Sequence, residues 1–95
     1  MQKIVINCQY GGFNLSDEAI NLYAKIKGED ARNIYVYNIE RNDLALIQVI
    51  EELGIKAFGN YSNLKIIEIP DDVKWEIHEY DGYEHIAEKH RTWRG

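Results

Sequence analysis

The apolar and polar positions of this chain follow strand-like and helix-like periods in turn. Residues 3–8 contain an unbroken β-branched run, which predicts a buried strand. After two glycines the period becomes helical, with Ser16 as the predicted N-cap and Gly28 just past the C-terminus. The apolar face of this helix is predicted to hold Ala19, Ile20, Tyr23 and Ile26. The chain therefore begins with a predicted strand and helix.

The middle of the chain repeats this pair of elements. Residues 33–39 place apolar side chains alternately on two faces, which predicts a second strand. Asn42 or Asp43 then caps a second predicted helix, and Gly54 ends it. The stripe that this helix buries is Leu46, Ile47, Ile50 and Leu53. A strand–helix–strand–helix order favours parallel strands at the centre of a sheet.

The last third is predicted to hold two strands and a helix. Residues 64–69 form a strand that Pro70 stops. Residues 73–78 alternate apolar with charged or polar side chains, which predicts a hairpin or edge strand with one solvated face. Asp81 to Glu84 resemble a capping box, with Asp in place of Ser or Thr, and predict a short C-terminal helix. The predicted fold is therefore α+β in the order β-α-β-α-β-β-α, with a mixed and partly parallel sheet.

Composition places this fold in one soluble domain over residues 1–95. Ninety-five residues bury one modest core, and no apolar run is long enough to span a bilayer or to act as a signal segment. The single cysteine, Cys8, cannot form an internal disulfide, which favours a reducing cytoplasm. Sixteen acids against eleven bases give a net charge of −5, which disfavours duplex nucleic acid as a partner. Seven tyrosines favour self-association into a homo-oligomer.

The turn after the first predicted strand is a candidate ligand-binding loop. Tyr10, Gly11, Gly12 and Phe13 lie between a strand and a capped helix, where backbone N–H groups are able to hold an anion. Neither known glycine-rich phosphate spacing is present, and Asp17 and Glu18 follow directly. The alternative is a tight turn that needs glycine for a positive φ.

The C-terminal residues His90, Arg91, Trp93 and Arg94 are the second candidate. Two guanidinium groups around an indole pair with phosphate oxygens and stack on a base. In the alternative, Trp93 packs on the sheet of its own protomer or on another subunit, and the arginines balance an acidic body. Together with the glycine turn, these residues form the predicted ligand-binding set.

Catalytic and metal chemistry find little support in the sequence. No zinc-ligand motif is present, and His85 and His90 are five residues apart, which turns them away from each other on a helix. Cys8 in a buried strand is expected to be a small hydrophobe, and the hydroxyl of Ser16 is expected to cap a helix. We therefore expect no catalytic residues, no metal and no cofactor.

Several motifs together resemble a family of small uncharacterised bacteriophage and prophage proteins. They are Tyr-Gly-Gly-Phe-x-Leu-Ser at residues 10–16, Glu-Tyr-Asp-Gly-x-Glu at 79–84 and His-Arg-x-Trp at 90–93. The resemblance extends over nearly the whole chain. It implies a phage accessory protein that works in the cytoplasm of a host bacterium, and it supplies no catalytic residues.

Three functions remain open on these grounds. The first is non-enzymatic binding of a small anionic ligand, such as a nucleotide used in host-defence signalling, at residues 10–13 together with the C-terminal set. The second is an interaction module that covers or inhibits a host protein through its acidic surface or its tyrosines. The third, a small hydrolase or nuclease that uses Asp81, Glu84, His85 or His90, is the weakest. We expect a binding protein rather than an enzyme.

Overall fold

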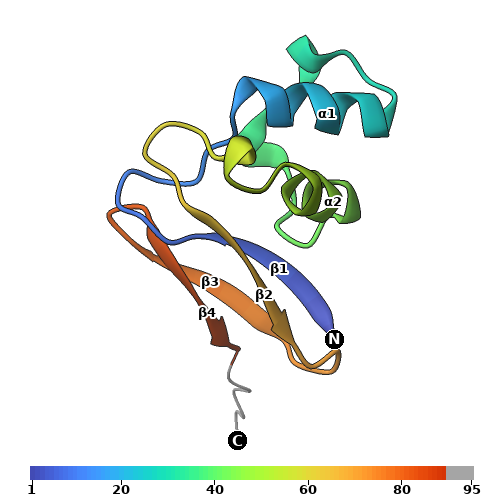
Figure 1. The fold of residues 1–95 in the computed structure, drawn as a ribbon. Coiled ribbons are helices and arrows are strands. Elements are labelled where there is room, and N and C mark those ends of the chain that lie inside the picture. Colours follow the sequence, from blue (N-terminus) through green and yellow to red (C-terminus); the bar gives the residue numbers. More distant parts are fainter. Residues whose placement is uncertain (90–95) are drawn as a thin grey trace, which may run out of the picture.

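Two helices and two antiparallel two-stranded sheets make up the computed structural model, which describes residues 1–89 (Figure 1). Strand β1 (Gln2–Asn7) pairs with β2 (Leu64–Ile69), and β3 (Trp75–Tyr80) pairs with β4 (Tyr83–Glu88). Both helices lie in the long connection between β1 and β2. The α+β class is confirmed. The partly parallel core is wrong, because both pairings within residues 1–89 are antiparallel.

The helices begin and end where the capping residues predict. In α1 (Asp17–Lys27), the Ser16 hydroxyl accepts a hydrogen bond from the Ala19 N–H at 3.1 Å, and Gly28 adopts a left-handed φ of 70°. In α2 (Leu44–Leu53), the cap is Asp43, one of the two predicted alternatives, and its carboxylate accepts from the Ala45 N–H at 2.8 Å. A short 3₁₀ turn, η3 (Gly54–Ala57), follows α2. Within residues 1–89, neither helix reaches the length and apolarity that crossing a bilayer demands.

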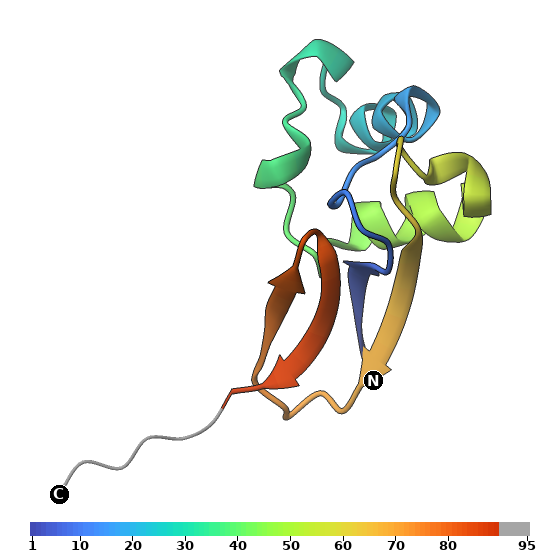
Figure 2. The ribbon, with the colours of Figure 1, turned by 90° about the vertical axis from the view of Figure 1, so that its left-hand side faces the viewer.

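Alternate residues of β1 face two different layers. Val5 packs with Leu64 of β2 against buried residues of both helices, among them Tyr23 and Leu46. Because neighbouring strand residues point to opposite faces, Ile4 and Ile6 point away from the helices, yet both are buried. Their side is covered by the β3–β4 hairpin, whose strand β4 lies beside β1 (Figure 2). The first sheet is therefore enclosed by helices on one face and by a hairpin on the other.

The predicted strand at residues 33–39 is wrong. The chain forms two 3₁₀ turns there, η1 (Ala31–Asn33) and η2 (Val36–Asn38), and buries Ile39. A strand needs a free edge to pair with, and the outer edge of β1 is occupied, since the Val5 N–H donates to the Arg41 carbonyl at 2.8 Å. The outer edge of β1 is therefore not free at Val5 to pair with this alternating segment.

The predicted C-terminal helix is also wrong. Asp81 and Gly82 have φ values of 49° and 89° and form the two-residue turn of a hairpin, so residues 83–88 are strand β4. Positive φ at both central positions is the geometry that an Asp-Gly pair favours between antiparallel strands. The observed order is β1-α1-α2-β2-β3-β4, in place of β-α-β-α-β-β-α.

Candidate functional site

The turn of the β3–β4 hairpin docks against the glycine turn that follows β1. The Gly11 N–H donates to the Asp81 carbonyl at 3.0 Å. A Cβ atom at Gly82 would lie 2.2 Å from the backbone nitrogen of Gly12, so the two turns approach as closely as glycine allows. Gly11 and Gly12 themselves adopt φ values of 125° and 105°. These contacts account for the glycine pair as a tight turn, the structural alternative considered for it.

A buried polar network holds this junction together. The Glu84 carboxylate, 3% exposed, accepts two hydrogen bonds from the Arg41 guanidinium at 2.5 and 2.8 Å and a third from the Asn7 N–H at 2.8 Å. The Asn7 side chain donates to the Gly82 carbonyl and accepts from the Asn63 N–H, at 2.8 and 2.9 Å. Within residues 1–89, every buried side-chain nitrogen and oxygen has a partner. The network therefore fixes the hairpin on β1.

A cavity of about 420 Å³ lies beside this network. Its walls come from the glycine turn, the hairpin turn and the segment before α2, and they comprise Gly11, Gly12, Phe13, Tyr37, Arg41, Glu79, Asp81, Gly82 and Glu84. The Arg41 guanidinium lies 3.7 Å from the centre of the Phe13 ring, so an aromatic face and a carboxylate both stabilise its charge. Three of the eight predicted ligand-binding residues line this cavity.

The charge of the cavity differs from that of an anion site. Among the described residues, the one cation of the lining is Arg41, which is already paired with Glu84, while Glu79 and Asp81 add two further carboxylates. Within the described part of the chain, neither Glu79 nor Asp81 forms an ion pair. A phosphate brought to this wall would meet net negative charge, which raises the free energy of binding.

Tyr10, the fourth predicted residue, belongs to an exposed aromatic cluster. Its ring centre lies 5.4 Å from that of Tyr83 and 6.5 Å from that of Tyr80, in tilted and edge-to-face arrangements. Tyr80 and Tyr83 are cross-strand partners on either side of the hairpin turn. The three side chains, here called the tyrosine patch, are 62%, 72% and 42% exposed for Tyr10, Tyr80 and Tyr83.

The other four predicted residues, His90, Arg91, Trp93 and Arg94, lie outside the described residues. Whether they converge with the glycine turn therefore stays a prediction. The residues set aside for nucleophilic chemistry are both described. The Ser16 hydroxyl donates to the Lys56 carbonyl at 2.6 Å in addition to its capping bond, and Cys8 is half-buried with its backbone N–H bonded to Asn63.

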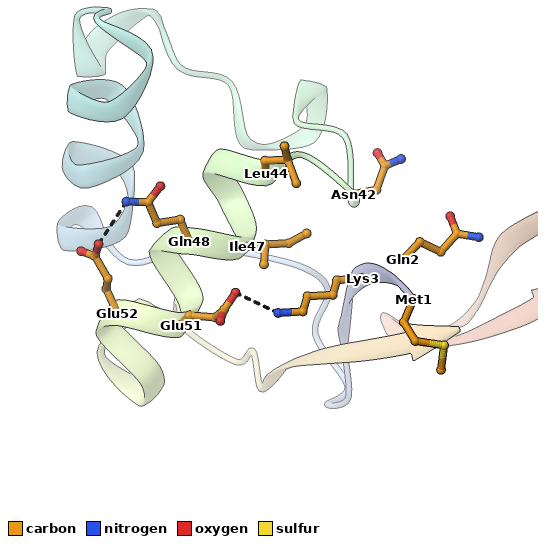
Figure 3. A pocket seen from close by; sticks show the side chains of 9 residues that line it. All are labelled: Met1, Gln2, Lys3, Asn42, Leu44, Ile47, Gln48, Glu51 and Glu52. Atoms are coloured by element: carbon orange, nitrogen blue, oxygen red, sulfur yellow. Dashed lines mark hydrogen bonds and ion pairs between the residues drawn. The ribbon is translucent and has the colours of Figure 1, made fainter. Parts of the chain in front are cut away.

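A second hollow of about 580 Å³ lies at the opposite end of β1, between that strand and α2 (Figure 3). Leu44 and Ile47 line it from the helix, and Gln2 of β1 and the preceding Met1 line it from the other side. Lys3 and Glu51 form an ion pair across it at 3.4 Å, and Glu52, a third charged residue of the lining, accepts a hydrogen bond from Gln48 at 3.1 Å. Its lining therefore mixes apolar side chains with polar and charged ones, and the Lys3–Glu51 pair neutralises only part of that charge.

Sequence reasoning placed none of Arg41, Glu84, Tyr80 and Tyr83 in a binding site, and it considered Glu84 only for the hydrolase or nuclease hypothesis. The signal that would have found three of them is the Asp81-Gly82 pair between two alternating segments, which is a strong hairpin pattern. In a hairpin, Tyr80 and Tyr83 are cross-strand partners and Glu84 points inward. The predicted helix would instead have separated Tyr80 from Tyr83. Arg41 offered no such signal, because its partner lies 43 residues away in the chain.

Comparison with protein-family models, curated proteins and solved structures finds no match for this chain. The resemblance to small phage proteins therefore stays a prediction, and function has to be argued from the geometry.

Proposed function

We propose that this protein works by non-enzymatic binding of another protein, and that the tyrosine patch is the surface it uses. The observation that carries the proposal is the meeting of Tyr10 with Tyr80 and Tyr83, residues far apart in sequence, at exposed positions. Tyrosine contributes a large amphipathic contact area and loses little conformational entropy on binding. A rigid group of such rings is typical of the centre of a protein interface.

The rigidity of the patch supports this proposal. Tyr80 and Tyr83 flank a two-residue turn, and that turn is fixed by the Gly11–Asp81 hydrogen bond and by the buried Glu84 carboxylate. Tyr10 comes directly before Gly11. The rings therefore need little reorganisation on binding, and a preorganised surface keeps more of its interaction free energy as affinity.

The charges around the patch indicate a basic partner. Glu76 lies on the same face of the hairpin as Tyr80, Asp81 lies in its turn, and the chain carries a net charge of −5. Tyrosine rings also attract guanidinium and ammonium groups through their faces. The proposed partner is therefore a protein segment rich in arginine or lysine. On the phage resemblance, it would be a host protein in the bacterial cytoplasm.

Site-specific photo-crosslinking tests this proposal. A benzophenone amino acid replaces Tyr80 in one variant and Tyr35 in a matched control, since Tyr35 is 68% exposed but lies outside the patch. We expect a discrete crosslinked protein in bacterial cells from position 80 and none from position 35. The purified partner should bind the wild type, and its binding should weaken at least tenfold in Tyr80→Ser and with rising salt. Equal crosslinking from both positions, or none from position 80, would contradict the proposal.

The cavity beside Arg41 supports a second candidate, the binding of a small anionic ligand. Its glycine walls and its guanidinium are the favourable features, and its three carboxylates are the unfavourable ones. A thermal-shift series with mono-, di- and cyclic nucleotides, run on the same protein, distinguishes the two candidates. A ligand that binds only the folded state raises its melting temperature. A nucleotide-dependent rise that Arg41→Gln abolishes would favour this second candidate over the first.

A further inference from the structure

The outer face of the β3–β4 hairpin carries two histidines side by side. His78 and His85 are direct cross-strand partners, and their ring centres lie 5.4 Å apart in an edge-to-face arrangement. Both residues are exposed. The sequence did not point to this pair, because the predicted C-terminal helix separated residue 85 from residue 78.

This arrangement suits a metal ion held between two imidazoles. Side chains directly opposite each other on an antiparallel ladder have Cβ atoms about 5 Å apart. Two ring nitrogens that each lie about 2 Å from one ion are then brought together by rotation of the side chains alone. Because the backbone ladder already fixes both ligands, the second nitrogen binds without a further loss of chain entropy.

Glu76 adds negative charge at the same place. Its Oε1 lies 2.9 Å from Nε2 of His78, two residues further along the same face of β3. A carboxylate beside a ligating imidazole orients the ring and raises its basicity. Within residues 1–89, no group of three histidine, cysteine or acidic side chains is arranged to hold a metal ion. The site therefore supplies two protein ligands and leaves the remaining positions to water or to another molecule.

We propose that His78 and His85 chelate one divalent transition-metal ion, with zinc, nickel and copper as the ions that imidazole ligands favour. The site is independent of the proposed function, because it requires neither a protein partner nor the tyrosine patch. Binding also requires unprotonated imidazoles, so the affinity should fall as the pH is lowered.

Calorimetric titration of the full chain with Zn²⁺ at pH 7.5 tests the proposal. We expect one ion per chain, with the affinity lowered at least tenfold in His78→Asn and in His85→Asn, and lowered again in the wild type at pH 5.0. His90→Asn is the matched control, because it removes the third histidine and should change the affinity less than twofold.

Nuclear magnetic resonance of the wild type provides a second measurement that does not depend on how the variants fold. Added Zn²⁺ should shift the ring-proton signals of His78 and His85 and leave those of His90 in place. The proposal is overturned if the His90 signals move instead, or if neither hairpin substitution lowers the affinity for Zn²⁺.

Discussion

Glu84 is the residue whose burial most constrains this structure. Its carboxylate is 3% exposed and is satisfied only because Arg41 and the Asn7 N–H converge on it from two other segments. A buried charge that keeps its partners costs little net free energy, whereas one that loses a partner destabilises the fold strongly. Arg41 would also be left as an unpaired cation with its side chain only 20% exposed.

We therefore expect Glu84→Gln to lower the free energy of unfolding by about 3 kcal/mol, because the Arg41 charge then has no counter-ion. Urea unfolding followed by circular dichroism measures this change. Glu88→Gln, at an exposed position of the same strand, is the matched control and should cost less than about 0.5 kcal/mol. Equal losses for the two variants would show that the buried ion pair contributes nothing specific.

Gly82 makes a separate prediction about backbone contact. Gly82→Ala should lower the free energy of unfolding by about 3 kcal/mol or more, because the new methyl group would lie 2.2 Å from the Gly12 nitrogen and the φ of 89° is strained for alanine. Gly28→Ala has a similar φ of 70° but nothing within 4 Å, and should cost only about 1 kcal/mol. Thermal unfolding of both variants compares them. Similar losses would mean that φ alone, and not the docking of the two turns, requires glycine at position 82.

At the scale of elements, Asp43 links the two helices. It caps α2, accepts a hydrogen bond from the Tyr23 hydroxyl at 2.7 Å and lies 3.2 Å from Lys27 Nζ, both of α1. Burial acts to raise the pKa of Asp43, but the hydrogen bonds from Tyr23 and Ala45 and the charge of Lys27 outweigh it and hold the pKa below its ordinary value. Burial, followed by the bond to Asp43, raises the pKa of Tyr23 above its ordinary value.

The lowered pKa of Asp43 sets the sign of a pH dependence. A carboxyl group whose pKa is lower in the folded state contributes stability above its unfolded pKa and loses it as the pH falls through the folded value. The stability of the wild type should therefore fall below about pH 4, and Asp43→Asn should flatten this fall. Urea unfolding between pH 2 and pH 6 measures it, with Asp72→Asn, at an exposed turn, as the control. A slope unchanged by Asp43→Asn would contradict the prediction.

The elements also show how far local pattern predicts this fold. Residues 3–8 and 64–69 were predicted as strands and residues 16–28 as a capped helix, because burial period and capping chemistry are local signals. Residues 33–39 carry the same alternation and form turns, because Arg41 occupies the edge of β1 that they would need. In the sequence, Asp81 is compatible with either a helix cap or a hairpin turn. Pairing of β3 with β4 selects the hairpin turn.

The candidate site was predicted only in part for the same reason. Residues 10–13 were selected from one local motif; Gly11, Gly12 and Phe13 line the cavity, whereas Tyr10 lies in the tyrosine patch. Their neighbours Arg41, Glu79 and Glu84 arrive through tertiary contacts that no local spacing encodes. The acidic character of the cavity, which disfavours a phosphate, comes from Glu79, Asp81 and Glu84.

At the scale of the whole molecule, the first strand is enclosed by two layers that come from different parts of the chain. The helices that cover one face come from the connection between β1 and β2, whereas the hairpin that covers the other comes from the end of the described chain. Ile4 and Ile6 remain buried only while that hairpin is docked against β1. The proposed interface and the proposed metal site both lie on the outer side of the same hairpin, so neither requires the interior to open.

The bond between the Asn7 N–H and Glu84 spans 77 positions of the chain. During synthesis on the ribosome, the isoleucines of β1 therefore lack their cover until the β3–β4 hairpin has left the exit tunnel. Contacts of such long range slow folding, because the entropy of closing the loop is lost before the contact forms. Until then, the nascent chain presents a bare apolar strand to chaperones.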